Sequence, residues 1–354
     1  MKILVYGASG QLGRRVLEQL RSRGLNVCLG GRDRARLEAM AEAGEEMRVG
    51  PLAQLPSGMA VIVNCAPLGR ADCDALIEAS LHHGAHYVDA CGEQSLIAHI
   101  LERHQEGALR AGRCVVPALG LDYAVGDCLA RLAAGGACSD LIIAYAFSGR
   151  QAGGNSLQFA TSARRGAEVV FRGGRRGPVP LELDSGRFDF PAPWGRQRVG
   201  RYGAGEVITV PRHTRTTNIR TLITASALVP HPVLLPLFPI LRPLVALVLR
   251  TPLRGLVGLV GRWLGGLRAP RQEDTKPAGG PAFVVVVEAF EGPRKLARLW
   301  ATGNDCHQTT AEVLVHGAEY LAGGRATQCG ALPPALALPP REFLNGLKSL
   351  RWGE

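Results

Sequence analysis

The stretch KILVYGASGQLG, residues 2–13, decides the fold of this chain. Its first five residues predict a strand, and the remaining seven follow the pattern G-x-x-G-x-x-G. In a Rossmann βαβ unit, the first glycine of such a turn bends the chain, the second lets backbone N–H groups approach a pyrophosphate, and the third lets the helix pack close to the strand. The amphipathic stretch that follows, with Val16, Leu17 and Leu20 on one side, predicts the helix whose N-terminus faces that pyrophosphate. The sequence therefore predicts a dinucleotide-binding site.

The second predicted strand covers residues 25–31, and the residues that follow it indicate which dinucleotide binds. In this type of fold that strand ends beside the adenosine ribose, and Arg32 follows it directly. An acidic side chain there binds the ribose 2′-OH of NAD, whereas an arginine pairs with the 2′-phosphate of NADP. Arg32 therefore favours NADPH/NADP, with Arg34 or Arg36 as further contacts. The alternative is a solvated helix start in which Asp33 is the N-cap.

Composition narrows the class of protein. With 354 residues, of which 46% are apolar, the chain is long enough for two domains with a substantial core. Its net charge of +11 comes from arginines spread along the chain, and with only 5% aromatic residues it has no stacking platform for nucleic acid. Nine cysteines without a C-x-x-C pair indicate reduced thiols. Because a strand begins at residue 2, no signal peptide is expected, and we expect a cytoplasmic protein.

Alternating strands and helices predict an α/β fold with a Rossmann-type doubly wound parallel sheet over residues 1–135. The predicted strands after the second lie near 47–49, 59–64, 87–89 and 114–116, and the predicted helices after the first lie at 34–43, 74–82 and 95–111. Ligands bind beyond the carboxyl ends of the strands in such sheets. Those ends, residues 64–67, 89–93 and 120–123, are therefore predicted to form the wall on the nicotinamide side.

Residues 139–300 predict a second α+β lobe, for substrate binding or dimerisation, built on a more antiparallel sheet. Its predicted strands are 141–147, 207–210, 221–225 and 283–290. A C-terminal helix within 305–325 has apolar residues at helical spacing and is predicted to pack back on the first domain.

Several of these motifs together resemble the saccharopine dehydrogenase-like NADP-binding oxidoreductases, a family that includes trans-acting enoyl reductases. The resemblance rests on residues 7–13, 31–37, 64–67, 87–89, 120–122, 205–213 and 301–305. It implies a two-lobed fold and an NADPH-dependent reductase. The chain departs from the family pattern at 66–69, which lacks the Gly-Pro-aromatic stretch, at Cys91, where the family has serine or threonine, and at 124–127, which lacks a common proline. The first two departures lie in the predicted nicotinamide pocket, so they bear on the substrate.

An apolar segment, residues 228–267, interrupts the second lobe. Its prolines exclude one continuous membrane-spanning helix. A helix over 253–267 would carry an apolar face with Trp263, bordered by Arg254 and Arg262, as interfacial helices do. Two interpretations stay open: peripheral contact with the inner face of a membrane, and a helical lid or homodimer face. Both suggest an oily small-molecule substrate, such as one presented on a carrier.

The chemistry requires a proton donor, because the cofactor supplies only the hydride. The predicted catalytic residues are Tyr123, Asp122 and His213. Asp89, Cys91 and Glu93 also follow a predicted strand. Capping of the neighbouring loops is the alternative role for Asp89 and Asp122, a small buried thiol is the alternative for Cys91, and a surface position is the alternative for His213.

The predicted cofactor-binding residues come from the glycine turn and from the ends of two strands. They are Gly7, Ser9, Gly10, Gln11, Leu12, Gly13, Arg32, Asn64, Cys65 and Ala66. No metal site is predicted. His82, His83 and His86 have a metal-like spacing, but they end a helix without a nearby cysteine or acid pair, so we expect them to face solvent.

The sequence as a whole predicts an NADPH-dependent reductase of a C=C (enoyl) or C=N bond in a hydrophobic, carrier-bound or lipid-like substrate. Two alternatives stay open. One is a membrane-associated protein that binds NADP(H) without catalysis. The other is a saccharopine-type amino-acid dehydrogenase, for which Arg212 and Arg220 are the candidates to bind a dicarboxylate.

Overall fold

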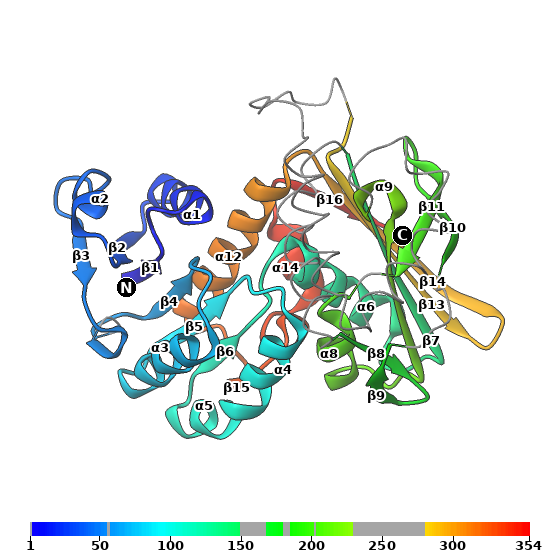
Figure 1. The fold of residues 1–354 in the computed structure, drawn as a ribbon, viewed down its shortest axis with the longest axis horizontal. Coiled ribbons are helices and arrows are strands. Elements are labelled where there is room, and N and C mark those ends of the chain that lie inside the picture. The colour runs from blue at the N-terminus through cyan, green and yellow to red at the C-terminus, as the bar shows by residue number, and fades with distance from the viewer. Residues whose placement is uncertain (1, 55–56, 149–167, 180–184, 202, 229–279) are drawn as a thin grey trace, which may run out of the picture.

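The computed structural model describes residues 2–54, 57–148, 168–179, 185–201, 203–228 and 280–354 (Figure 1). Two sheets lie on either side of a central layer of helices, with the first sheet at the left of Figure 1 and the second at the right. The helices of the central layer are α6 (Gly126–Ala134), α8 (Glu206–Thr209), α12 (Cys306–Ala322) and α14 (Pro340–Gly346). One hydrophobic core includes side chains from both sheets and this layer, so the lobes share their interior.

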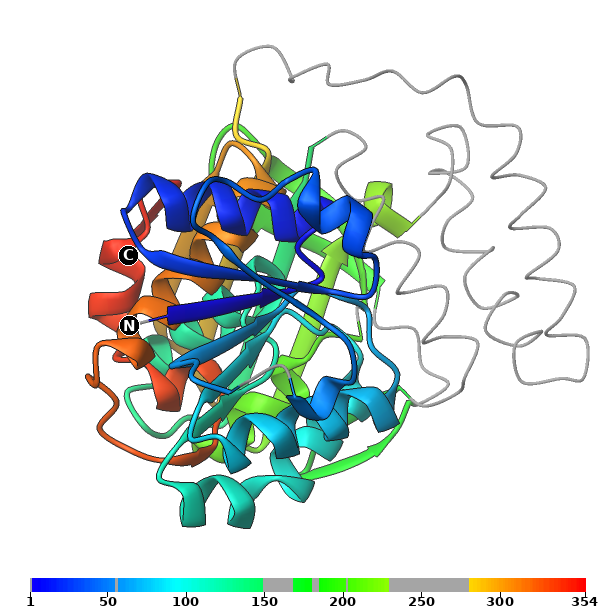
Figure 2. The same ribbon diagram turned by 90° about the vertical axis from the view of Figure 1, so that its left-hand side faces the viewer.

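The first sheet has seven strands, all parallel, in the order β15-β6-β5-β4-β1-β2-β3. Its strands are β1 (Lys2–Tyr6), β2 (Asn26–Gly31), β3 (Glu46–Val49), β4 (Val61–Asn64), β5 (His86–Asp89), β6 (Cys114–Val116) and β15 (Gly330–Ala331). Figure 2 views the molecule from the side of this sheet. The chain order reverses between β1 and β4, and this is the position where doubly wound sheets bind ligands. The predicted fold class is confirmed.

The helices of this domain differ from prediction in two places. They are α1 (Gln11–Ser22), α2 (Arg34–Glu38), α3 (Arg70–His82), α4 (Gln94–Arg103) and α5 (Gln105–Ala111). The helix predicted over 34–43 is wrong beyond Glu38, and the single helix predicted over 95–111 is two helices interrupted at His104. Neither glycine nor proline stands at the interruption, so local propensity gives no signal for it.

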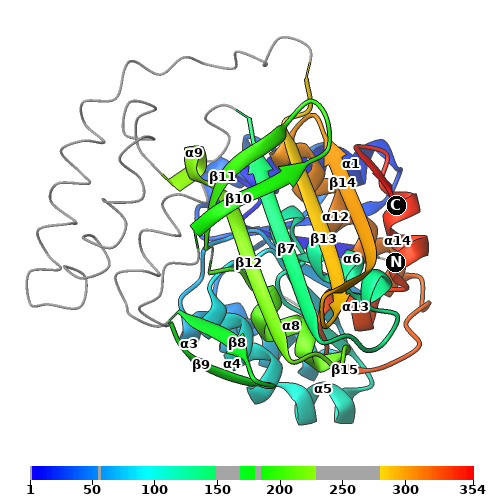
Figure 3. The same ribbon diagram turned by 90° about the vertical axis from the view of Figure 1, so that its right-hand side faces the viewer.

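The second sheet is mostly antiparallel, as predicted, and Figure 3 views it face-on. Its order is β10-β11-β12-β7-β13-β14-β16, with the hairpin β8–β9 paired to β12 and with β7 and β12 parallel. The strands are β7 (Asp140–Phe147), β8 (Val169–Arg172), β9 (Arg175–Pro178), β10 (Ser185–Phe190), β11 (Gly195–Arg201), β12 (Asn218–Thr224), β13 (Phe283–Glu291), β14 (Arg294–Gly303) and β16 (Leu350–Gly353).

The strand predicted over 207–210 is wrong: these residues form α8 and the start of a 3₁₀ turn, Val210–Arg212. Glu206 and the four residues after it are all buried. Such a short buried run fits a strand and a helical turn equally well by periodicity, so the pattern could not separate them.

The C-terminal part of the chain joins the two lobes. β15 extends the first sheet and β16 extends the second. Between β14 and β15, α12 lies against α1, where the Gln19 side chain donates to the carbonyl of Gln308 at 3.2 Å and Arg23 pairs with Glu319. The first domain therefore depends on residues more than 280 positions further along the chain.

The apolar segment predicted over 228–267 lies, apart from Leu228, outside the described residues. The interpretations as a membrane contact, a lid or a homodimer face therefore stay predictions. Among the helices of the described residues, none is both long enough and apolar enough to cross a bilayer.

His86 begins β5 and is buried, so the expectation that it faces solvent is wrong, whereas His82 and His83 are exposed as expected. The position of His86 on a central strand of the sheet places its ring inside the domain. Its Nδ1 accepts a hydrogen bond from the backbone N–H of Cys114 at 3.0 Å, which ties β5 to the start of β6. Burial lowers the pKa of His86 to about 4.

We expect His86 to make the protein sensitive to mild acid. Between pH 6.5 and about 4 the unfolded chain binds a proton that the folded chain does not, so stability is complete above pH 6.5 and falls as the pH drops. The loss amounts to about 3 kcal/mol over this window. His86→Asn keeps an acceptor without titrating, so urea unfolding at several pH values will show its stability rising relative to the wild type as the pH falls. His82→Asn is the exposed control. A difference that does not change with pH would contradict the assignment.

Candidate cofactor site

The glycine turn connects β1 to α1 in a conformation that other residues cannot adopt. Gly7 has φ +80° and its N–H donates to the carbonyl of Gly30 at 2.9 Å. A Cβ at Gly13 would lie 2.2 Å from the carbonyl oxygen of Gly7, and a Cβ at Gly7 would lie 2.8 Å from the backbone nitrogen of Ala66. The turn, the first helix and the loop after β4 are therefore in direct backbone contact.

The N-terminus of α1 has no side-chain cap. Its N-cap residue, Gly10, provides no side-chain hydrogen bond, and the first turn contains no acidic residue. The first N–H groups of a helix have no partner within the helix, and the helix dipole favours an anion beside them. This helix start is therefore suited to bind a phosphate.

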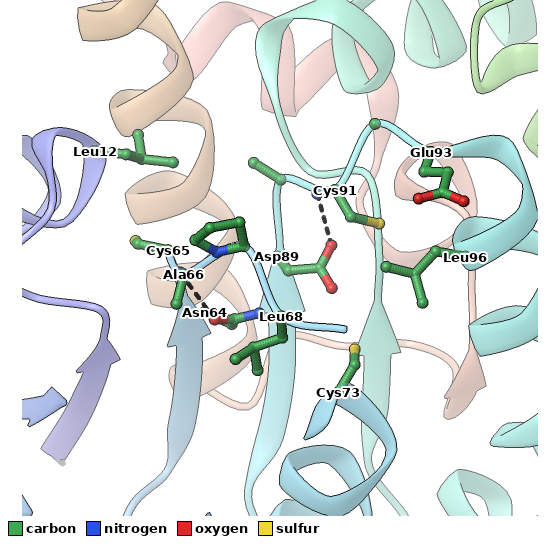
Figure 4. A pocket seen from close by; sticks show the side chains of 13 residues that line it. Leu12, Asn64, Cys65, Ala66, Leu68, Cys73, Asp89, Cys91, Glu93 and Leu96 are labelled. Atoms are coloured by element: carbon green, nitrogen blue, oxygen red, sulfur yellow. Dashed lines mark hydrogen bonds between the residues drawn. The ribbon is translucent and has the colours of Figure 1, made fainter. Parts of the chain in front are cut away.

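A pocket of about 350 Å³ lies beyond the carboxyl ends of β4 and β5 (Figure 4). It is lined by Leu12, Asn64, Cys65, Ala66, Pro67, Leu68, Cys73, Asp89, Ala90, Cys91, Gly92, Glu93 and Leu96. Leu12 belongs to the first turn of α1, so the pocket and the helix start are adjacent. The described lining is apolar apart from Asn64, two carboxyl groups and three thiols, and it contains no lysine, arginine or histidine.

Asn64 and Asp89, at the ends of the two strands, hold the loops of the pocket in place through Tyr87. The Asn64 side-chain amide donates to the Tyr87 hydroxyl at 3.0 Å, and that hydroxyl donates to Asp89 Oδ2 at 2.8 Å. Asn64 Oδ1 accepts from the backbone N–H of Ala66 at 3.0 Å. The predicted cofactor residues Asn64 and Ala66 therefore belong to one rigid wall.

Asp89 is 2% exposed and caps two loops. Its Oδ1 accepts from the N–H of Cys91 at 2.9 Å and from the N–H of Ala118 at 3.2 Å. Burial raises the pKa of Asp89, while these hydrogen bonds act in the opposite direction. With both oxygens engaged, Asp89 has the contacts expected of the loop-capping alternative.

The three thiols of the pocket, Cys65, Cys73 and Cys91, are not activated. Burial raises the pKa of Cys73 to about 12, and burial together with the nearby Asp89 charge raises the pKa of Cys91 well above its usual range. A thiolate is the reactive form of cysteine, so these thiols are neutral, unreactive lining near pH 7.

Glu93 is the pocket-lining acid with partial solvent exposure. It immediately precedes α4, and its Oε1 accepts a hydrogen bond from the Ser95 hydroxyl at 2.7 Å. In Figure 4 its side chain lies on the same wall as Cys91 and Leu96, opposite Leu12. Sequence reasoning grouped Glu93 with other residues that follow strands, and only the pocket singles it out.

The structure places Tyr123 and Asp122 behind this wall and not among the pocket's lining residues. Both lie in a single π-helical turn, Leu121–Val125, after β6. Tyr123 is 5% exposed, and its hydroxyl donates to the carbonyl of Gly92 at 3.1 Å. Tyr123 is therefore positioned to hold the loop that carries Glu93, and direct proton transfer by either residue stays a prediction.

His213 does not line the pocket either, and its side chain has no exposed surface, so the alternative of a surface histidine is wrong. Its Nε2 lies 2.8 Å from Asp127 Oδ1, and its Nδ1 lies 3.0 Å from the Thr214 hydroxyl. This pair joins the second lobe to α6. A catalytic role for His213 stays a prediction that none of these contacts favours.

Arg32 is exposed directly after β2. Asp33 is the N-cap of α2 and accepts from the Arg36 N–H at 3.2 Å, as the alternative interpretation expected. Arg34 pairs with Glu38 at 3.7 Å and Arg36 pairs with Asp33 at 3.2 Å. Arg32 has no ion pair within the described residues, so its guanidinium is available to a ligand.

These features define the class of fold: a Rossmann-type doubly wound parallel sheet joined to a lobe with a mixed sheet. Among solved structures, the chain is similar to apo saccharopine dehydrogenase (L-Glu forming) from Saccharomyces cerevisiae, with a TM-score of 0.62, 12% identity and 99% coverage of both chains. A mutant of meso-DAPDH from Clostridium tetani aligns with a TM-score of 0.46 and 14% identity over 97% of this chain and 95% of the other. No family model and no curated protein matches the sequence. The expected resemblance is confirmed for the fold.

Proposed function

We propose that this protein is an NADPH-dependent oxidoreductase that reduces a C=C or C=N bond in a hydrophobic substrate. One observation carries the proposal: a mostly apolar pocket lies beyond the carboxyl ends of β4 and β5, directly beside the uncapped N-terminus of α1. In doubly wound sheets this is the position where a dinucleotide binds.

The residues present fit such a cofactor. The backbone N–H groups from Gly10 to Gly13 would hold the pyrophosphate, Arg32 would pair with the 2′-phosphate, and the wall at Asn64 and Ala66 would bound the nicotinamide. The turn at Gly7 could not carry a Cβ without meeting Ala66. Bound NADPH supplies a hydride at the ring, and the protein places the substrate and provides a proton.

The pocket lining supports an uncharged, apolar substrate. The described lining contains no cationic side chain that could pair with a substrate carboxylate. Arg212, a candidate to bind a dicarboxylate substrate, instead pairs with Glu102 at 3.6 Å. Hydride addition to one atom of the double bond leaves its neighbour to accept a proton. Glu93, partly exposed and held by Ser95, is the proposed donor of that proton, with Tyr123 positioning its loop.

We expect phosphorylated nucleotides to bind in preference to NAD and NADH, and Arg32 to be the cause. A hydrogen bond to a charged group contributes about 1.5–3 kcal/mol, so Arg32→Ala should raise the Kd for NADPH by about 10- to 100-fold and leave the Kd for NADH unchanged. Fluorescence titration and thermal shift with all four nucleotides provide the measurement. Arg110→Ala is the matched control, because Arg110 is an exposed arginine on α5 that pairs with Glu106 and belongs to no part of the proposed site. Equal effects of Arg32→Ala on NADPH and NADH would contradict the proposal.

Assays with enoyl and imine substrates distinguish the proposed reductase from a protein that binds NADPH without catalysis. NADPH would stabilise the fold, but no enoyl or imine substrate would oxidise it. A saccharopine-type dehydrogenase would instead oxidise or reduce amino-acid substrates, and the similarity of fold at 12% identity does not decide between these activities.

A further inference from the structure

A cluster of two histidines and one aspartate lies between α3 and the helix pair α4–α5. The ligand-type atoms of Asp74, His99 and His104 all lie within 4.8 Å of one another. Asp74 Oδ1 is 2.9 Å from His99 Nε2 and 2.7 Å from His104 Nε2. His99 and His104 follow Asp74 by 25 and 30 residues in the sequence. Figure 1 shows the three helices side by side.

The interruption between α4 and α5 makes this cluster possible. Residues five apart on a continuous α-helix point about 140° away from each other, since each residue turns the helix by about 100°. His104 stands at the interruption, with φ −99° and ψ 1°, and this brings its ring to the same aspartate as His99. The deviation from the predicted continuous helix thus has a local consequence: it assembles the three side chains.

Charge and exposure at the cluster suit a cation. Within the described residues no lysine or arginine pairs with Asp74, whose polar contacts are the two imidazoles. The side chain of His104 is 3% exposed, while those of His99 and Asp74 are 21% and 22% exposed. One side of the cluster is therefore packed, and the other is open to solvent for entry of an ion and for a water ligand.

We propose that Asp74, His99 and His104 form a binding site for one divalent transition-metal ion of the zinc type. Two imidazole nitrogens and one carboxylate oxygen, with solvent in the fourth position, are an established ligand set for Zn²⁺. Bonds of about 2.1 Å at tetrahedral angles place ligand atoms about 3.4 Å apart. Each imidazole Nε2, now 2.9 or 2.7 Å from Asp74 Oδ1, therefore needs to move away from that oxygen by only about 0.5–0.7 Å as the ion replaces the hydrogen bonds.

The site is separate from the cofactor pocket but adjacent to it. Cys73 and Leu96 line the pocket, while Asp74 follows Cys73 directly and His99 follows Leu96 by one helical turn. None of the three ligands lines the pocket. A bound ion would tie α3 to α4 and α5 behind that wall, and it takes no part in the proposed hydride transfer.

Zinc titration of the full chain after chelator treatment tests the site. Competition with a chromophoric chelator should show one Zn²⁺ per chain that Asp74→Asn, His99→Gln and His104→Gln each weaken at least about 100-fold, since loss of even an outer partner of a zinc ligand costs 10- to 100-fold. The double variant His82→Gln/His83→Gln changes two exposed neighbouring histidines and should retain wild-type affinity. Wild-type zinc affinity in Asp74→Asn, His99→Gln and His104→Gln would overturn the proposal. Failure of the wild type to bind one Zn²⁺ per chain would overturn it too.

Two measurements on the wild type locate the bound zinc without relying on variants, which can fail to fold. They also distinguish the proposed site from zinc binding by any of the nine cysteines. Zinc should protect the partly exposed His99 from modification by diethyl pyrocarbonate, mapped by mass spectrometry, while the exposed His82 and His83 continue to react. The Co²⁺ derivative should lack the charge-transfer band of thiolate ligation. An unprotected His99, or a thiolate band, would show that zinc binds elsewhere and would overturn the assignment.

Discussion

Gly10→Val is expected to abolish NADPH binding while the chain still folds. Gly10 is exposed with φ −75°, a conformation open to any residue, and a Cβ there would meet only the Gly7 carbonyl oxygen, at 3.2 Å. The added side chain would instead occupy the N-terminus of α1, where the pyrophosphate must approach the backbone. Losing two hydrogen bonds to phosphate, at about 1.5–3 kcal/mol each, raises the Kd by about 100-fold or more.

Two other glycines supply controls for this experiment. Gly69 is the N-cap of α3 with φ −70° and ψ 166°, close to the −75° and 165° of Gly10, and a Cβ there meets nothing within 4 Å. Gly69→Val should therefore keep both the fold and NADPH binding. Gly13→Val should lose the fold itself, because its Cβ would lie 2.2 Å from the Gly7 carbonyl oxygen and 2.8 Å from the Ala8 Cα.

Titration calorimetry with NADPH and circular dichroism on the three variants give the outcome. Retention of wild-type NADPH affinity by Gly10→Val would show that the dinucleotide does not use the start of α1, and the proposed function would fall with it. Loss of structure in Gly69→Val would show that valine is not tolerated at such a cap, and Gly10→Ala would then replace the test variant.

Glu206→Gln is expected to remove a large pH dependence from the stability of the protein. Glu206 begins α8 and has no exposed surface. One carboxylate oxygen accepts from the Tyr145 hydroxyl, and the other has no hydrogen-bond partner within the described residues. Burial raises the pKa of Glu206 well above its usual range, with the buried Asp127 charge acting in the same direction.

Stability changes with pH according to how many protons the folded and the unfolded chain bind. Between the unfolded pKa near 4.5 and the raised folded pKa, the folded chain keeps a proton that the unfolded chain loses. The stability that Glu206 contributes is therefore complete below pH 4.5 and is lost as the pH rises through the folded pKa. The loss is about 1.4 kcal/mol per pH unit, or about 2.7 kcal/mol over two units of that window.

Urea unfolding at pH 5, 6, 7 and 8 gives the free energy of unfolding of the wild type and of Glu206→Gln. Groups that titrate equally in both proteins cancel in the difference between the two values. The variant should gain stability relative to the wild type as the pH rises from 5, up to the folded pKa of Glu206, while Glu106→Gln, at an exposed carboxyl group, serves as the control. A constant difference between Glu206→Gln and wild type over this range would mean that the buried carboxyl is ionised in the folded protein.

The first domain was predictable because its signals are local. Strand, glycine turn and helix lie within consecutive residues, and the backbone contacts at Gly7 and Gly13 require glycine whatever surrounds them. The position of Arg32 directly after the second strand was also predictable, since the end of that strand has a fixed place relative to the turn. The buried strands are apolar runs between turns, so their existence and parallel pairing followed from pattern alone.

The tertiary structure alone decided which of the candidate residues reach the pocket. Tyr123 and His213 lie near loop ends in the sequence, but packing against Gly92 and Asp127 turns them away from the pocket lining, and Glu93 is left as its partly exposed acid. His86 lies beside two exposed histidines in sequence and is nevertheless buried in the sheet.

Contacts between distant segments explain the remaining differences. The break at His104, the helical turn at Glu206 and the additions of β15 and β16 to the two sheets all depend on such contacts, which leave no local pattern. Asp74, His99 and His104 likewise meet only because three helices pack together. The sequence by itself determined the glycine turn between β1 and α1, where backbone geometry dictates the residue type. Packing determined the rest, because burial and the partners of a side chain are properties of the whole fold.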